Sequence, residues 1–194
     1  MCFWPVFRGN VSDSTSMNGK PWHVLALSLV LLCTAAVSGC APKHASPAEI
    51  SARISEVKRM NDVSALKKIA DDDDNPNIRQ AAVERIHDQE FLKKVVRGDK
   101  DFGVRLAALR NLYDDKVIAE VATGDRSRYV RIAAVNLVDD QRVIAEVALT
   151  DDDRVVRMNA VKRLKDRDVL AKVEKNDKDA KIRKLAGERL EQME

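Results

Sequence analysis

Aromatic side chains are scarce in this chain of 194 residues, at 4% of the composition. Beyond residue 40 the aromatic residues are Phe91, Phe102, Tyr113 and Tyr129. Proteins that bind single-stranded nucleic acid stack bases on such rings, and a planar pigment needs similar surfaces, so the sequence offers little for either ligand. The formal net charge is only +3, which lacks the basic surplus of nucleic-acid-binding domains. We therefore expect no nucleic-acid partner.

Residues that hold metals or perform catalysis are few as well. The chain has three cysteines and three histidines, and no two histidines stand at a metal-binding spacing. No serine-nucleophile motif, glycine-rich phosphate loop or zinc-protease motif occurs. The run Asp71–Asp74 lacks the alternating ligands and central glycine of a calcium loop, and we interpret it as a solvated turn or a weak cation site. The sequence thus predicts no cofactor, no metal and no enzymatic activity.

One long apolar run is present, and it covers residues 24–37. It is shorter than the roughly 20 apolar residues that a membrane-spanning helix needs. Between Met17 and the run lies one positive charge, that of Lys20, and a cysteine follows the run closely at position 40. A positive charge, a short apolar run and small residues after it are typical of a secretory signal peptide.

The tetrapeptide Val-Ser-Gly-Cys at positions 37–40 resembles the lipobox of bacterial lipoproteins, in which an aliphatic and two small residues precede an obligatory cysteine. The resemblance implies cleavage between Gly39 and Cys40 and a diacylglycerol thioether on the Cys40 thiol, whose acyl chains anchor the protein. Cys40 would be the one cysteine left after cleavage, which excludes a disulfide. Ala41, where aspartate would favour retention at the inner membrane, favours the outer membrane, facing the periplasm.

These features divide the N-terminal region into three parts. Residues 17–39 form an ordinary lipoprotein signal if translation starts at Met17, whereas residues 1–16 are neither a basic leader nor apolar throughout. We therefore expect Met17 to be the initiator and residues 1–16 to be an over-extended start, with Met1 as the alternative. Residues 40–46 would form a short tether.

After the tether an arginine returns every 26 residues, a period typical of stacked repeats. The arginine row comprises Arg53, Arg79, Arg105, Arg131, Arg157 and Arg183. It defines units 50–75, 76–101, 102–127, 128–153 and 154–179, with a capping half unit at 180–194. Apolar residues at helical spacing predict two helices in each unit, with an Asp, Asn or Ser as N-cap. The predicted fold is all-α, a solenoid of stacked two-helix repeats over residues 47–194, because one unit cannot enclose its own core.

A row of aspartates keeps the same period in the turns between units. The aspartate row comprises Asp73, Asp99, Asp125, Asp151 and Asp177. Because a planar guanidinium suits bidentate pairing with a carboxylate, we interpret the two rows as a structural ladder that links successive turns. The alternative interpretation is a guanidinium stripe that clamps a polyanion.

The pattern D-x-x-x-x-V-R-x-x-A-V-x-x-L-x-D resembles bacterial HEAT-like repeats, here in a short form that covers roughly residues 50–190. The resemblance implies an α-solenoid with the first helices on the convex side and the second helices lining a concave groove. Glu56 and Gly187 depart from the pattern in the first and last units, as terminal caps require, because their outer faces meet water.

The second helices therefore supply the candidate partner-binding surface. Its tethered end is basic, and its middle is small, mixed and partly apolar. The candidate residues are Lys67, Lys68, Lys93, Lys94, Arg97, Glu120, Glu146 and Leu149. We expect a lipid-anchored cell-envelope scaffold that binds a protein or peptide in this groove. The alternatives are a membrane-surface or envelope-integrity factor whose basic end contacts anionic lipid, and a merely solvated helix face.

Overall fold

The computed structural model describes residues 45–193, and within this range the chain forms helices and no strand, which confirms the all-α prediction. No helix in this range is both long enough and apolar enough to cross a membrane. The predicted signal peptide, Cys40 and most of the tether lie outside the described residues. The helices are α1 (Pro47–Arg59), α2 (Val63–Asp72), α3 (Pro76–Val83), α4 (Gln89–Gly98), α5 (Phe102–Arg110), α6 (Asp115–Gly124), α7 (Arg128–Leu137), α8 (Gln141–Thr150), α9 (Arg154–Arg163), α10 (Arg167–Asn176) and α11 (Ala180–Glu191).

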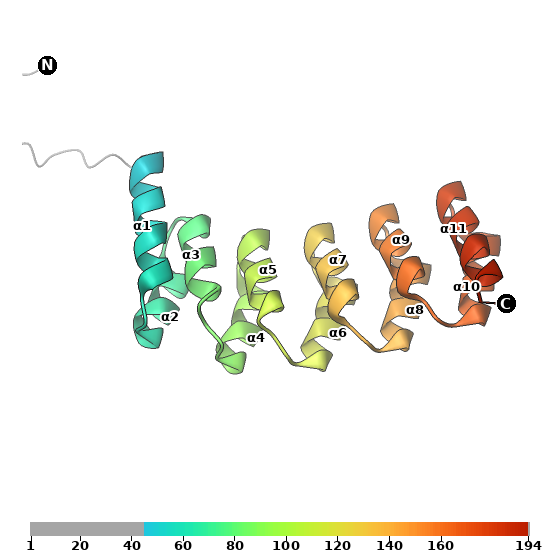
Figure 1. The fold of residues 1–194 in the computed structure, drawn as a ribbon, viewed down its shortest axis with the longest axis horizontal. Coiled ribbons are helices and arrows are strands. Elements are labelled where there is room, and N and C mark those ends of the chain that lie inside the picture. Colours follow the sequence, from blue (N-terminus) through green and yellow to red (C-terminus); the bar gives the residue numbers. More distant parts are fainter. Residues whose placement is uncertain (1–44, 194) are drawn as a thin grey trace, which may run out of the picture. The chain divides into compact units, whose positions relative to one another are not determined.

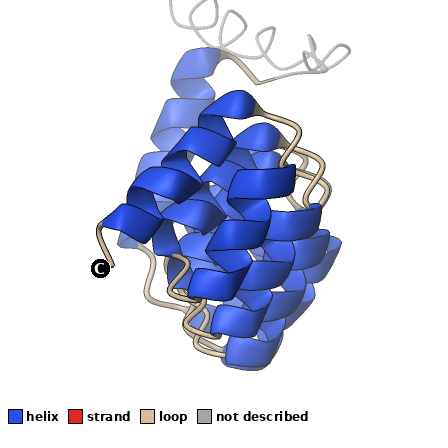
Figure 2. Cartoon of the chain, turned by 90° about the vertical axis from the view of Figure 1, so that its right-hand side faces the viewer, coloured by secondary structure: helices blue, strands red, loops and turns tan. Residues whose placement is uncertain are grey.

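The helices stack in chain order as an α-solenoid of two-helix repeats, from α1 at one end to α11 at the other (Figure 1). Each even-numbered helix packs most closely against the odd-numbered helix that follows it, which belongs to the next unit. Viewed from the α11 end, the units lie one behind another as two layers of helices (Figure 2). Successive units therefore share their apolar faces, as a repeat stack requires.

The helix starts follow from the polar residues between the helices. The aspartates that cap the even-numbered helices with a side-chain oxygen are Asp62, Asp88, Asp114, Asp140 and Asp166. At the start of α1, Ser46 and Glu49 form a reciprocal capping box, and a proline follows Ser46. Ser127 precedes α7 but makes no side-chain capping bond. The predicted N-caps thus lie where the sequence placed them, with one bond missing at Ser127.

The core is a continuous apolar layer between the two rows of helices. Leu92, Leu109, Ile144 and Leu164 are completely buried, although they belong to four successive units. Each of these side chains is covered partly by the following or preceding unit, so no unit buries its apolar face alone.

The two rows differ in spacing, and this difference decides which row lies inside the curve. The odd-numbered helices pack closely against one another, whereas neighbouring even-numbered helices approach only weakly. Figure 1 shows the even-numbered row spread more widely and on the outer side. Small residues buried along the odd-numbered helices permit this close approach. They are Ala81, Ala82, Ala107, Ala108, Ala134 and Ala160.

The placement implied by the resemblance is therefore wrong for residues 46–193. The first helices line the inner side of the stack, and the second helices lie on the outer side. The predicted concave groove on the second helices is replaced by an outer surface, and the inner surface belongs to α1, α3, α5, α7, α9 and α11.

Candidate functional site

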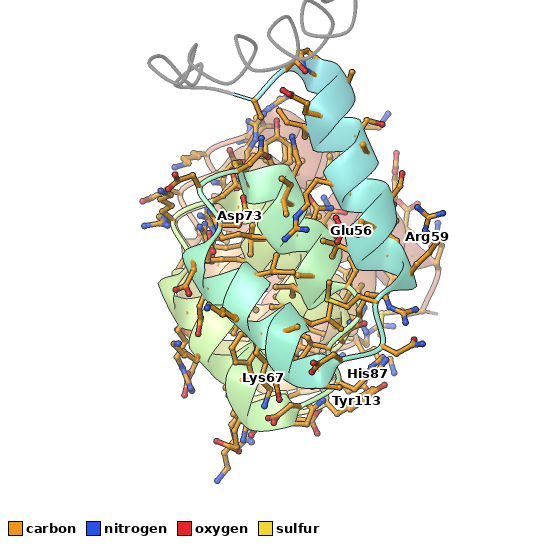
Figure 3. The ribbon with its side chains drawn as sticks, turned by 90° about the vertical axis from the view of Figure 1, so that its left-hand side faces the viewer. Glu56, Arg59, Lys67, Asp73, His87 and Tyr113 are labelled. Carbon is orange, nitrogen blue, oxygen red and sulfur yellow. The ribbon has the colours of Figure 1, made fainter. Side chains whose placement is uncertain are left out.

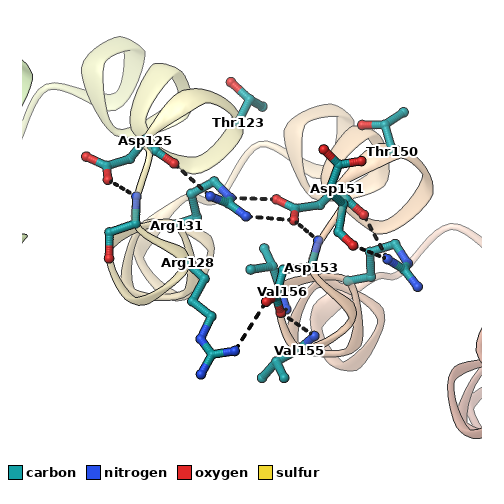
Figure 4. A network of polar contacts seen from close by, with 12 residues as sticks. Thr123, Asp125, Arg128, Arg131, Thr150, Asp151, Asp153, Val155 and Val156 are labelled. Carbon is teal, nitrogen blue, oxygen red and sulfur yellow. Dashed lines mark hydrogen bonds and ion pairs between the residues drawn. The ribbon is translucent and has the colours of Figure 1, made fainter.

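The arginine and aspartate rows meet in the turns between units, as Figure 4 shows for one rung. Arg131 of α7 donates from Nε to Oδ2 of Asp151 at 2.7 Å and from Nη2 to Oδ1 at 2.9 Å. Its Nη1 donates to the carbonyl oxygen of Asp125 at 2.8 Å. Oδ1 of Asp151 also accepts from the backbone amide of Asp153 at 2.8 Å. One side chain thus joins the turn before its own helix to the turn one unit later.

The same contacts recur along the stack. The other bidentate pairs are Arg79–Asp99, Arg105–Asp125 and Arg157–Asp177. Each of these aspartates binds the preceding arginine through its carboxylate and the following arginine through its carbonyl oxygen. The contacts therefore form one connected chain from the carbonyl oxygen of Asp73 to the guanidinium of Arg183.

Both ends of the predicted ladder are incomplete. Arg53 donates to Glu56 on its own helix at 2.7 Å instead of binding Asp73, and its side chain is 43% exposed. Figure 3 shows Glu56 on α1 and Asp73 in the turn after α2. Arg183 keeps its bond to the Asp177 carbonyl oxygen but pairs with no carboxylate among the described residues. Arg53 is therefore not part of the ladder, because Glu56 lies within reach on the next turn of α1.

The complete rungs are buried and charged. Arg79 and Arg105 are only 3% and 2% exposed. Donation to Asp125 raises the pKa of Arg105 above its ordinary value, and burial opposes this only in part. Burial raises the pKa of Asp99, but the hydrogen bonds from Arg79 and the Asp101 amide outweigh it and hold the pKa below its ordinary value. These guanidinium groups donate their hydrogen bonds to groups within the fold, which favours the structural interpretation of the two rows over the polyanion clamp.

Acid should weaken the ladder. In the folded protein the pKa values of Asp99 and Asp177 lie below the ordinary carboxyl value. Their stabilising contribution is complete above the unfolded pKa of about 4 and is lost as the pH falls through the lower, folded pKa. We therefore expect the free energy of unfolding, measured in urea, to fall steeply below about pH 4. Asp99→Asn should be less stable at neutral pH and should lose less on acidification; parallel pH profiles for the two chains would contradict this.

A second row of polar side chains caps the odd-numbered helices from the next unit. Arg163 of α9 donates to the carbonyl oxygens of Val135 and Val138 at the end of α7. The other members of this donor row are Arg85, Asn111 and Arg189. Leu137 occupies the equivalent position on α7 and is 44% exposed. The last carbonyl oxygens of α5 therefore receive no such donor from α7.

Leu137→Arg should stabilise the fold. The new guanidinium would complete the donor row, and one hydrogen bond of this kind contributes about 1 kcal/mol net. We expect a higher urea midpoint with an unchanged slope. Asn136→Arg is the matched control, because it adds the same charge one residue away from the donor row. Equal midpoints for the two variants would show that the added charge, and not the restored cap, matters.

The predicted partner-binding cations lie on α2 and α4, and most of them are paired within the fold. The pairs are Lys67–Asp88, Lys93–Asp114, Lys94–Asp71 and Arg97–Glu120, with N–O distances of 2.5 to 2.9 Å. Each pair joins two neighbouring units. Lys68 is exposed and has no ion pair among the described residues. The basic end of this surface is thus largely neutralised, and it lies on the outer row of helices.

The clefts on this side follow the boundaries between units. One of about 620 Å³ is lined by Asp71–Asp74, Arg79 and Lys94, among others. Another of about 240 Å³ includes Glu146, which is exposed together with Leu149 of the same helix. The predicted partner-binding residues are therefore distributed over separate clefts between units, and no single groove brings them together.

The inner row carries an apolar surface that the sequence analysis did not assign. Phe102 of α5 and Tyr129 of α7 are 47% and 53% exposed, and their ring centroids lie 5.6 Å apart. Leu106, Ile132 and Met158 occupy one equivalent position in three successive units and are half-buried against the core. We call these five residues the apolar strip. It crosses α5, α7 and α9, the central helices of the inner row.

Departures from the repeat were the available signal for the apolar strip. Phe102 stands where the neighbouring units carry Pro76 and Arg128, and Tyr129 stands where they carry Gly103 and Val155. The repeat frame does not need an exposed ring at either position. The strip was not predicted, because the orientation implied by the HEAT-like resemblance placed the binding surface on the second helices.

Among residues 45–193, no group of His, Cys, Asp or Glu is arranged to hold a metal ion. The apolar strip is the candidate site that the geometry of the described residues defines. No protein-family model, curated protein or solved structure matches the chain.

Proposed function

We propose that the chain is a lipid-anchored scaffold of the cell envelope that holds a protein partner and has no catalytic activity of its own. Cleavage after Gly39 and acylation of Cys40 would tether residues 46–194 to a membrane through the short segment 40–46. The sequence around the cleavage site favours the outer membrane, facing the periplasm. The repeats would be a short variety of HEAT-like repeat.

The apolar strip is the observation that carries the proposal. Phe102 and Tyr129 expose about half of their surface and contact each other, whereas the cations exposed on α2 and α4 are largely paired with carboxylates of neighbouring units. Exposed apolar surface gathered at one place is characteristic of protein interaction sites. Aromatic side chains are also enriched among the residues that dominate binding energies at interfaces. The strip therefore supports partner binding through the inner row.

The alternative function, a membrane-surface factor that contacts anionic lipid, has less support. It depends on the basic end formed by Lys67, Lys68, Lys93, Lys94 and Arg97. Four of these five cations already bind carboxylates of neighbouring units, so little uncompensated charge is left to attract phospholipid headgroups.

Site-specific crosslinking in the native host tests the proposed function. A photoreactive residue at position 129 of the full chain should give a discrete adduct with another protein, whereas the same residue at position 175, exposed on α10, should not. Identical adducts from both positions, or none from position 129, would overturn partner binding through the inner row. Cys40→Ser tests the anchor separately: the wild-type chain should fractionate with the membrane and the variant should not.

A further inference from the structure

The three helices that carry the apolar strip contain no acidic residue. The sequences of α5, α7 and α9 include arginines and one lysine but neither aspartate nor glutamate. Several of these cations are used inside the fold, such as Arg105 and Arg131 in the ladder. The remaining cations border the apolar strip, and the acidic residues beside it are the N-cap aspartates at the starts of α5 and α9, Asp101 and Asp153.

Two of the bordering cations are unpaired. Arg110 follows Leu106 by one helical turn on α5, and Lys162 follows Met158 by one turn on α9, so each lies beside the apolar strip at its C-terminal edge. Both side chains are exposed, and neither has an ion pair among the described residues. Unpaired cations beside exposed apolar residues complement a partner that presents carboxylates beside apolar side chains.

The opposite edge of the apolar strip carries two arginines beside the N-cap aspartates. Arg128 and Arg154 begin α7 and α9, and their side chains are 49% and 62% exposed. Each reaches one N-cap aspartate, Asp153 at 3.4 Å and Asp179 at 3.2 Å. These are longer than the N–O distances of strong charge-assisted pairs, which are about 2.7–2.9 Å. Arg154 can therefore turn towards a carboxylate of a partner at little cost. Arg128 is held further, because it donates to the Tyr129 hydroxyl at 3.1 Å and lies over the Tyr129 ring.

The dimensions of the strip suit a helix. Packed helices lie about 8–10 Å apart, so three successive odd-numbered helices span about 20 Å. A partner helix rises about 1.5 Å per residue, so roughly 14 residues cross all three. Apolar residues spaced i, i+3, i+4 and i+7 on that helix would lie against the strip, and acidic residues on one flank would reach Arg110 and Lys162.

A flat lipid surface fits the strip less well. The strip lies on the inner, more closely spaced row of helices, midway along the stack. Because the stack curves towards this side, the end units would meet a planar bilayer before the central strip did. A single helix is narrow enough to reach the central strip between the end units, whereas a planar bilayer is not.

We infer that the apolar strip and the unpaired cations at its C-terminal edge form a docking site for an acidic amphipathic helix of a partner protein. The inference rests on the proposed function and specifies the chemistry of the partner. Phe102, Leu106, Tyr129, Ile132 and Met158 supply the apolar contact. Arg110 and Lys162 set the preference for carboxylates.

Peptide titration tests the inference directly. The probe is a fluorescein-labelled 18-residue (about five helical turns) synthetic peptide with leucine at i, i+3, i+4 and i+7 and glutamate elsewhere on its surface. A second probe replaces every glutamate by lysine, and a third keeps the acidic composition in a scrambled order. Fluorescence anisotropy with the purified full chain should show saturable, salt-sensitive binding of the acidic amphipathic peptide alone. Equal binding of the acidic and basic peptides would overturn the inference.

Two variants locate the binding. Arg110→Glu combined with Lys162→Glu reverses the unpaired cations without breaking an ion pair among the described residues, and it should weaken binding of the acidic peptide by about tenfold or more. Lys172→Glu combined with Lys175→Glu applies the same change in charge to α10 and should leave binding unaltered. Equal losses in both double variants would overturn the site. Circular dichroism confirms that each variant remains folded.

Anionic vesicles separate the lipid alternative. Vesicles of phosphatidylglycerol and phosphatidylcholine should not compete with the acidic peptide. If the vesicles do compete with the peptide, and if Arg110→Glu combined with Lys162→Glu abolishes this competition, the site binds lipid and the inference is overturned. The crosslink tests the proposed function separately. An adduct at position 129 in the native host would support partner binding whether the partner helix is acidic or not.

Discussion

Replacing Arg105 by alanine should lower the free energy of unfolding by about 3–5 kcal/mol, because removing one partner of a buried ion pair leaves the other charge uncompensated. Arg105 is 2% exposed, and the side chain of its partner Asp125 is 6% exposed. The variant would also lose the bond to the Asp99 carbonyl oxygen, so the two turns that flank this unit lose their common link. Urea unfolding monitored by circular dichroism measures the change.

Arg53→Ala is the matched control. It changes the same residue type at the equivalent position of the repeat, but Arg53 pairs with exposed Glu56 on the surface of α1. Exposed pairs of this kind contribute about 0–1 kcal/mol, so the control should remain close to the wild type. Similar losses in the two variants would mean that burial in the ladder contributes nothing, and that the arginine row acts through helix propensity alone.

Deleting a whole repeat should leave a folded protein. Removal of residues 120–145 joins the first half of α6 to the second half of α8, and both helices have the same register. Arg105 would then face Asp151, which occupies the position of Asp125 one unit later. We expect unchanged helicity per residue and a cooperative thermal transition at a lower temperature, because the shorter stack buries less apolar surface.

Deleting residues 120–144 instead should abolish the cooperative fold. One residue more at the junction turns the rest of the joined helix by about 100°, since a helix has 3.6 residues per turn. Val147, now 2% exposed, would leave the core, at a cost of about 1.5–3 kcal/mol. Asp151 would no longer face Arg105, which adds about 3–5 kcal/mol. Together these losses approach the whole stability of a typical domain, about 5–15 kcal/mol. If both deletions behave alike, the repeat register does not control the fold.

The candidate site could be predicted from the repeat only in part. The sequence shows two aromatic residues that the repeat does not need, but it does not show which residues they contact. Phe102 and Tyr129 stand 27 positions apart and meet only because α5 and α7 pack side by side. The cations of α2 and α4, by contrast, looked available in the sequence. Their acidic partners lie about one repeat away, so the ion pairs appear only when the units are stacked.

The sequence alone determined the helical units, their caps and the pairing of the arginine and aspartate rows. These features depend on local spacing, since helix periodicity, N-cap chemistry and a constant repeat length bring the same groups together in every unit. Only the tertiary structure decided which row of helices lies inside the curve, and with it where the binding surface faces. That choice depends on small differences in the distances between neighbouring helices, which the volumes of many packed side chains set jointly. No local sequence pattern specifies these distances between helices, so the apolar strip could be located only in the structure of the stacked repeats.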